Sequence, residues 1–227
     1  MTDHPTSATP GSGSYLNQGS DIYRESFRII RAETSLDRFP DDLEPVVVRM
    51  VHASGDPTIA DSIAFTPGLA RACRDALRAG AAILCDSSMV ATGIIRSRLP
   101  RENQVVCHIK DPRLAELAQQ RGTTKTCAAV DLWAADGLLD QAVVAIGNAP
   151  TALFRLLEVC QETGARPAGV VGIPVGFVGA AESKQALVDS DLGLEYLTLL
   201  GRRGGSAVTV AAVNAIASSD ELTNEHR

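Results

Sequence analysis

Short apolar segments alternate with amphipathic segments along most of this 227-residue chain, and that alternation limits the possible folds more than any other feature. Compact runs rich in Val, Ile and Leu predict buried strands, and apolar residues that recur every three or four positions predict helices. The predicted strands cover residues 81–86, 104–109, 141–147, 168–174 and 196–201. The predicted helices around them cover residues 66–80, 111–122, 149–164, 179–189 and 204–217. Strands separated by helices run mostly parallel, so we expect a three-layer α/β/α, doubly wound domain of about five strands.

The composition agrees with one domain of this kind. Hydrophobic residues make up 45% of the chain and aromatic residues only 4%, so the core must consist of Ala, Val, Leu and Ile. Such a core suits layered α/β packing. The first residues are rich in Ser, Thr, Gly and Pro, and the last residues are polar. We therefore predict a disordered tail at residues 1–14, a single domain at residues 15–217 and a frayed tail at residues 218–227.

The charge and the cysteine content argue against several classes of protein. The net charge is −6 and no basic run occurs, so we expect no nucleic-acid partner. No apolar run is long enough to span a membrane and no signal peptide is recognisable, which predicts a soluble, cytoplasmic protein without a membrane partner. The cysteines are odd in number and form no CxxC pair, so reduced, buried thiols are favoured over disulfides or a zinc site.

Two further helices are predicted before residue 66. Residues 21–39 form an amphipathic pattern in which Tyr23, Phe27 and Ile30 share one face. In the next segment, LEPVVVRMVHASGDP, three consecutive valines suggest a strand. However, the apolar residues recur at helical spacing from Leu43 onward, which favours a helix that ends at Gly55.

His52 lies on the second of these helices, nearly opposite its apolar stripe, and Arg49 precedes it by one turn. No second His or Cys stands at ligand spacing, so a locally assembled metal site is not expected. Its position leaves two interpretations equally open. His52 is either an acid/base or hydrogen-bonding group in a binding site, or a structural histidine whose polar atoms are satisfied.

Small, polar and charged residues gather where the predicted strands end, which is where doubly wound sheets bind ligands. Neither a GxGxxG pattern nor a P-loop occurs, so dinucleotide and P-loop sites are disfavoured. Asp86 is a catalytic group, a ligand-binding residue at the switch point or a helix cap, of which capping is the default role, and Met89 is expected to pack. The segment GRRGGSAV is either a tight turn with exposed arginines or a site for carboxylates or phosphates. The candidates at these strand ends are Asp86, Met89, Asn148, Gly176, Gly179, Glu182, Lys184, Arg202 and Arg203.

Six segments in order resemble the precorrin-8X methylmutase family, which is also found in a cobalt-precorrin-8 form. They are IYRESFRIIRAE, RMVHASGD, CDSSMVATGI, GNAPTAL, GIPVGFVGAAESK and GRRGGSAV. The resemblance covers about residues 15–217. It implies a flavodoxin-like sheet, a homodimer with active sites near the subunit interface and no cofactor. It also implies that a methyl group migrates from C-11 to C-12 of ring C, which converts precorrin-8X to hydrogenobyrinate in cobalamin biosynthesis.

The resemblance also assigns roles to single residues. His52 matches the proton donor or acceptor, and Ser26 and Arg49 match positions that contact the substrate. Lys125 stands where the family pattern leads us to expect Arg, and a lysine keeps the charge but lacks the bidentate fork. With the strand-end candidates, these residues complete the predicted corrinoid-binding set, and no metal ligands are predicted.

The chemistry of the reaction is consistent with this set. A methyl shift around a conjugated ring needs the π-system to be polarised, and a histidine can do so by protonating or hydrogen-bonding a ring nitrogen. The acetate and propionate groups of the substrate suit Arg49, Lys125, Arg202 and Arg203 as carboxylate partners. The alternative is a flavodoxin-like module that binds a flavin, a nucleotide or a corrinoid without isomerase activity. The sequence does not say whether the natural substrate carries cobalt.

Overall fold

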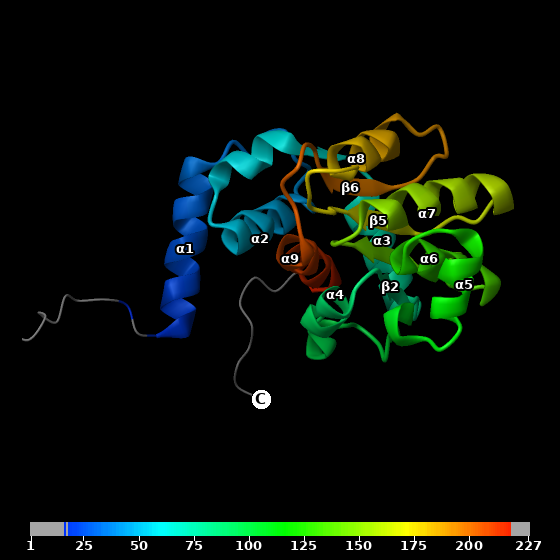
Figure 1. Cartoon of the computed structure of the whole chain (residues 1–227). Helices are drawn as coiled ribbons and strands as arrows, with labels where there is room; N and C mark the ends of the chain where they lie inside the picture. The colour runs from blue at the N-terminus through cyan, green and yellow to red at the C-terminus, as the bar shows by residue number, and fades with distance from the viewer. Residues whose placement is uncertain (1–15, 17, 219–227) are drawn as a thin grey trace, which may run out of the picture.

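The computed structural model describes residue 16 and residues 18–218. The predicted tail at residues 1–14, and all of the predicted C-terminal tail except Ser218, lie outside the described residues. The remainder forms the predicted α/β/α layers, with a sheet in the middle and helices on both of its faces (Figure 1). No helix within the described ranges is long and apolar enough to cross a membrane.

The sheet of the described chain has six strands in the order β1-β6-β5-β4-β2-β3. The five strands from β2 to β6 are parallel, whereas β1 pairs antiparallel with β6 at one edge. Numbered among themselves, the parallel strands follow the order 2-1-3-4-5, which is the flavodoxin-like order that the resemblance implies. The strands are β1 (Ile63–Phe65), β2 (Ile83–Cys85), β3 (Val105–Val106), β4 (Val143–Ile146), β5 (Gly169–Gly172) and β6 (Tyr196–Leu199).

The helices divide between the two faces of the sheet. One hydrophobic core joins the sheet to α1, α2, α3, α4 and α9, and a second core joins it to α6, α7 and α8. A small third core joins α5 to α6. The helices are α1 (Gly19–Glu33), α2 (Glu44–Ser54), α3 (Leu69–Arg78), α4 (Ser88–Gly93), α5 (Leu114–Arg121), α6 (Lys125–Ala135), α7 (Pro150–Thr163), α8 (Ala180–Asp189) and α9 (Ser206–Ala217).

The central strand β4 shows why these apolar runs form strands between two helical layers. All four of its residues are buried. Val143 and Ala145 belong to the first core, whereas Val144 and Ile146 belong to the second. Side chains of a strand point alternately to opposite faces, so a strand covered on both sides must be apolar at every position.

Several predicted boundaries differ from the structure. The helix predicted over residues 21–39 ends at Glu33, because Thr34 has an extended backbone. The strand predicted over residues 104–109 pairs only at Val105 and Val106, and a 3₁₀ turn follows at His108–Lys110. Strand β1 and the helices α4 and α6 were not predicted. The predicted end of α2 is confirmed, since Gly55 closes it in the left-handed conformation with φ 65°.

Candidate active site

His52 lies half-buried against two aromatic rings that α1 contributes. The centroid of its ring is 5.3 Å from that of Tyr23 and 5.4 Å from that of Phe27. One turn earlier on α2, the guanidinium of Arg49 lies 5.1 Å from the Phe27 ring and 5.7 Å from the Tyr23 ring. The helical spacing of Tyr23 and Phe27 therefore builds one platform that supports both the imidazole and the guanidinium.

The open side of the His52 imidazole faces a groove of about 530 Å³. Ser26 lies on the wall of this groove, which we call the His52 groove, so the structure brings Ser26 and His52 to one surface. Within the described residues, no side chain or backbone group hydrogen-bonds the imidazole. The residues around the groove include Ser26, Ile29, Ile30, Glu33, Val51, His52, Gly55 and Pro57.

The surroundings of His52 favour its neutral form. Burial lowers the pKa of the imidazole below 6.5, and the nearby charge of Arg49 lowers that pKa further. At neutral pH the ring therefore carries one N–H donor and one unprotonated nitrogen, and a ligand can use both.

A second groove, of about 750 Å³, lies between the end of α2 and the start of α9. Its lining includes Ala53, Ser54 and Asp56 from the end of α2 and the segment after it, and Val175, Arg203, Gly204 and Ala207 from the two loops and the start of α9. Because residues 53–57 border both grooves, the segment that follows His52 separates them. We call this second hollow the Arg203 groove.

Two glycine-rich loops at the carboxyl edge of the sheet are joined by backbone hydrogen bonds. The N–H of Gly205 donates to the carbonyl of Ile173 at 2.9 Å, and the N–H of Gly176 donates to the carbonyl of Arg202 at 3.2 Å. A Cβ at Gly204 would lie 2.5 Å from the Ile173 carbonyl oxygen, and Gly204 has a φ of 154°. This close approach requires glycine and fixes the loop after β5 beside the loop after β6.

The same edge exposes large apolar side chains. Phe177 and Val178 are 86% and 89% exposed, and Met89 on α4 is 72% exposed. The guanidinium of Arg202 lies 5.4 Å from the Phe177 ring. Exposed apolar side chains beside a cation are typical of a surface that binds a ligand or a partner. Met89 therefore does not pack inside the fold, contrary to the simpler expectation.

Asp86, expected to contact the ligand or to cap a helix, is buried at the end of β2. Its carboxylate accepts three backbone N–H groups, from Gly147 at 3.0 Å, Asn148 at 2.8 Å and Ala149 at 2.7 Å. Burial raises the pKa of the carboxyl group, and these N–H groups counteract that effect. Asp86 thus holds the loop after β4 at the point where the strand order reverses, and it leaves the side chain of Asn148 exposed.

Lys184 and Arg203 also bind other parts of the protein. Lys184 is fully buried, and its Nζ donates to the backbone carbonyl of Arg203 at 2.7 Å. Burial lowers the pKa of Lys184 to about 8. The Arg203 guanidinium in turn donates to Asp56 at 2.6 Å and to the Thr58 hydroxyl at 2.9 Å. Lys184 therefore cannot contact a ligand directly in this arrangement, because its ammonium is buried beneath the loop that carries Arg203.

The remaining candidates lie elsewhere along the carboxyl edge. Lys125 is exposed at the start of α6, where the Thr124 hydroxyl lies 2.8 Å from the Thr151 hydroxyl near the start of α7. This contact places Lys125 near the loop that carries Asn148. Gly179 adopts the left-handed conformation just before α8, and Glu182 is exposed in the first turn of that helix.

The candidates therefore form three groups. Ser26 and His52 line the His52 groove, and Arg49 lies one turn before His52 against the same two rings of α1. The residues of the two glycine-rich loops meet with Lys184 near the Arg203 groove. Lys125, Asn148 and Asp86 lie around the loop after β4. The sequence did not point to Asp56, since a single aspartate between a glycine and a proline has no distinctive pattern.

Taken together, these features define a class of protein. It is a flavodoxin-like doubly wound domain with a neutral histidine, several cations and exposed apolar loops near one edge of the sheet. A family model described as precorrin-8X methylmutase matches residues 21–219. The chain therefore belongs to the precorrin-8X methylmutase family.

Individual relatives agree with the family match. A precorrin-8X methylmutase of Pseudomonas aeruginosa is 49% identical over 207 residues, which is 91% of this chain and 99% of the relative. A cobalt-precorrin-8 methylmutase of Salmonella typhimurium is 41% identical over 208 residues, covering 89% of this chain and 96% of the relative. The crystal structure of a precorrin-8X methylmutase from Thermus thermophilus superimposes with a TM-score of 0.79 at 40% identity, covering 88% of this chain and 95% of that one.

Proposed function

We propose that this chain catalyses the reaction for which its family is named, an isomerisation in cobalamin biosynthesis. A methyl group migrates from C-11 to C-12 of ring C, and precorrin-8X becomes hydrogenobyrinate. The observation that carries the proposal is the half-buried, neutral imidazole of His52 at the wall of an open groove.

His52 acts as the acid/base group. The migration needs electron density to be drawn through the conjugated ring, and a proton or a hydrogen bond at a ring nitrogen does this. The neutral imidazole can offer its N–H or accept a proton at the other nitrogen. A bound substrate rich in carboxylates adds negative charge nearby, which favours the protonated imidazole and counteracts the effect of Arg49.

The acidic side chains of the macrocycle bind cations around the grooves. Arg49 is adjacent to His52, and Arg202 and Lys125 are exposed along the carboxyl edge. The start of α9, which has no side-chain cap, also favours carboxylates through its free N–H groups. The apolar face of the macrocycle lies against Val175, Phe177 and neighbouring side chains, while Ser26 contacts its edge.

The active form is a homodimer. Ile22 and Ile29 are 42% and 39% exposed on α1, and Ile29 borders the His52 groove. A partner subunit on this face of α1 would cover these side chains and close the groove. Such an interface typically buries on the order of 1,600 Å². Light scattering should give the mass of a dimer at micromolar protein, and a monomer with full activity would contradict the dimer.

The substrate is the metal-free macrocycle, precorrin-8X. Two relatives named precorrin-8X methylmutase are each 49% identical to this chain, whereas the cobalt-precorrin-8 methylmutases named among its relatives reach 41%. Turnover of precorrin-8X and cobalt-precorrin-8 should be compared side by side. We expect the metal-free substrate to have the higher kcat/KM.

A cytoplasmic location stays a prediction from the sequence.

Incubation of the protein with precorrin-8X tests the proposed function. The absorbance spectrum should change to that of hydrogenobyrinate, and His52→Ala should slow the change by about 10²–10⁴-fold. A protein that binds hydrogenobyrinate without converting precorrin-8X would instead be a corrinoid carrier. A protein that purifies yellow with a flavin spectrum would contradict both.

A further inference from the structure

Lys184 is the least expected charged side chain of the described chain. It is fully buried, and no carboxylate among the described residues pairs with it. An unpaired buried ammonium is costly for folding, and burial lowers the pKa of Lys184 to about 8. We therefore expect the hydrogen bond of Lys184 either to stabilise the fold or to hold part of the site in position. That bond, from Nζ to the Arg203 carbonyl at 2.7 Å, holds the turn after β6 from below.

On the other side of this turn, the side chain of Arg203 contacts the segment that follows α2. The Arg203 guanidinium donates to Asp56 at 2.6 Å, to the Thr58 hydroxyl at 2.9 Å and to the Ser62 hydroxyl at 3.4 Å. Asp56 also accepts the Thr58 N–H at 2.9 Å, so the segment that receives the guanidinium is itself ordered. We refer to the contacts from Lys184 through Arg203 to Asp56 as the Lys184 bridge.

The Lys184 bridge borders the Arg203 groove. Asp56 and Arg203 both line this groove, and their hydrogen bond joins the segment after α2 to the turn after β6. Asp56 follows His52 by four residues, and its neighbours Gly55 and Pro57 line the His52 groove. The bridge therefore fixes the distance between the turn after β6 and the segment that separates the two grooves.

We propose that Lys184 is a positioning residue, which acts through Arg203 and Asp56 to set the width of the Arg203 groove beside His52. This inference rests on the proposed function, because the groove is taken to receive part of the corrinoid. It differs from direct substrate binding by Lys184 or Arg203, since here both cations use their hydrogen bonds inside the protein. A wrongly spaced wall weakens binding of the macrocycle while leaving the reacting group intact.

Three variants cut the bridge at different places. Lys184→Met keeps the length of the side chain and removes the donor, Arg203→Met removes the guanidinium, and Asp56→Asn removes the charge of the acceptor. The side chains of Arg203 and Asp56 are 46% and 40% exposed, so their variants should fold even if Lys184→Met does not. The matched controls are Lys110→Met, an exposed lysine, and Arg78→Met, an exposed arginine 3.6 Å from Asp75 at the opposite end of the sheet.

For Lys184→Met and Arg203→Met we expect KM for precorrin-8X and Kd for hydrogenobyrinate to rise on the order of tenfold, with kcat changed little. Asp56→Asn should have a smaller effect of the same kind, and Arg203→Lys should restore part of the loss. The double variant Lys184→Met with Arg203→Met should lose no more than the worse single variant, because both cut one bridge. Both controls should match the parent protein.

Hydrogen exchange of the protein without ligand tests the bridge separately from the reaction. Amides of residues 56–62 and 201–206 should exchange faster in Lys184→Met and Arg203→Met, while those of α7 stay unchanged. If the parent protein neither binds nor converts corrinoids, the proposed function fails, yet this exchange result still supports or contradicts the bridge. Unchanged KM and Kd in a folded Arg203→Met variant would overturn the inference. So would weaker binding in Arg203→Met but not in a folded Lys184→Met, which would indicate direct substrate contact.

Discussion

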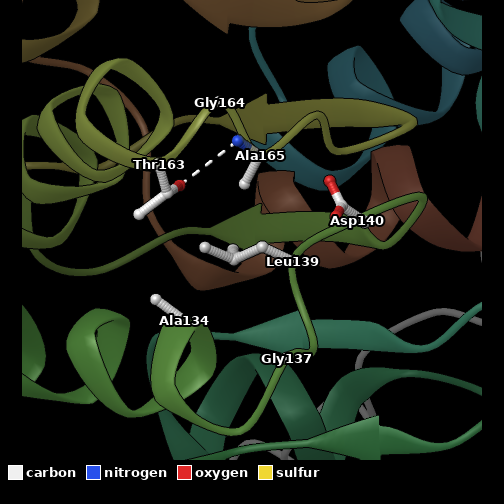
Figure 2. A pocket seen from close by; sticks show the side chains of 7 residues that line it. All are labelled: Ala134, Gly137, Leu139, Asp140, Thr163, Gly164 and Ala165. Atoms are coloured by element: carbon white, nitrogen blue, oxygen red, sulfur yellow. Dashed lines mark hydrogen bonds between the residues drawn. The ribbon is translucent and has the colours of Figure 1, made fainter.

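The two edges of the sheet use similar residues for different purposes. At the amino edge, a hollow of about 460 Å³ lies beside Leu139, Asp140 and Thr163 (Figure 2). The Thr163 hydroxyl donates to the Val159 carbonyl at 2.7 Å and accepts the Ala165 N–H at 3.2 Å. Asp140 accepts the Arg166 N–H at 2.7 Å. The side chains that could hold a ligand there already close the turns between helix and strand.

Near the carboxyl edge, by contrast, polar atoms are available to a ligand. The His52 imidazole has no hydrogen-bond partner within the described chain, and exposed apolar side chains stand beside Arg202. A hollow with polar residues is therefore not enough to indicate a site. What distinguishes the carboxyl edge is that its polar groups are not all used by the backbone of the protein.

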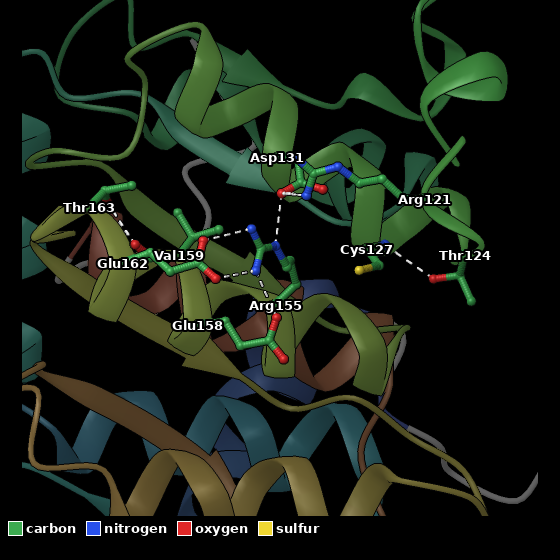
Figure 3. Close-up of polar contacts among 9 residues, drawn as sticks. All are labelled: Arg121, Thr124, Cys127, Asp131, Arg155, Glu158, Val159, Glu162 and Thr163. Atoms are coloured by element: carbon green, nitrogen blue, oxygen red, sulfur yellow. Dashed lines mark hydrogen bonds and ion pairs between the residues drawn. The ribbon is translucent and has the colours of Figure 1, made fainter. Parts of the chain in front are cut away.

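Arg155 shows the same distinction for a charged group (Figure 3). Its guanidinium pairs with Asp131, Glu158 and Glu162, each at 2.8 Å, and joins α6 to α7. Hydrogen bonds to Glu162 raise its pKa above the usual range. This cluster stabilises the packing of two helices, whereas Arg49 lies over the rings of Tyr23 and Phe27 that also support His52. We expect substitutions at Arg155 to change stability and leave turnover intact.

The largest effect that would test this contrast is expected at His52. General acid–base groups typically contribute about 10²–10⁴-fold, so His52→Ala should lose about that much turnover. Its melting temperature should change little, because the ring is half-buried and packs mainly against Tyr23 and Phe27. The thermal midpoint and the rate of hydrogenobyrinate formation are the two measurements. Unfolding of the variant would show that the histidine is structural.

Arg49→Ala should have the next largest effect. Loss of one charged hydrogen bond to a substrate carboxylate should weaken hydrogenobyrinate binding by about 1.5–3 kcal/mol. Titration followed by absorbance or calorimetry gives the dissociation constant. Arg78→Ala, at the amino edge, is the control and should bind normally. An unchanged dissociation constant for Arg49→Ala would remove Arg49 from the site.

Lys184 gives a pH-dependent prediction. Its pKa is about 8 in the folded protein and near 10.5 when the side chain is exposed. Between these two pH values the unfolded chain binds a proton that the folded chain does not. The free energy of unfolding therefore increases as the pH rises through this range. The stability of the parent protein relative to Lys184→Met should therefore increase as pH rises from about 8 to 10.5. Urea unfolding of both proteins measures this, and parallel pH profiles would contradict it.

The smallest effect is expected at the amino edge. Asp140→Ala removes the acceptor for the Arg166 N–H, which should cost about 1 kcal/mol of stability. Turnover of precorrin-8X should stay within about twofold of the parent, since no step of the reaction uses this hollow. A large loss of turnover in a folded Asp140→Ala protein would show that the two edges are not functionally distinct.

Features that depend on residues close together in the sequence could be predicted, whereas features that depend on packing between distant segments could not. The five parallel strands, and the position of Arg49 one turn before His52, could be predicted because helical and strand periodicities act over short distances. That Ser26 belongs with these two residues was expected only from the family resemblance. Strand β1 has only three residues and α4 only six, too few for a period to show. Whether a polar residue beyond the end of a strand is exposed, as Asn148 is, or lies buried, as Asp86 and Lys184 do, depends on packing between distant segments. No local pattern in the sequence records it.

Substitution of His52 by asparagine tests the central claim most directly. Asparagine can hydrogen-bond a ring nitrogen but cannot take up or release a proton near neutral pH. If His52 transfers a proton during methyl migration, His52→Asn should bind hydrogenobyrinate normally and lose about 10²-fold or more in turnover of precorrin-8X. Turnover near that of the parent protein would mean that His52 only orients the macrocycle, and the acid/base role would be wrong.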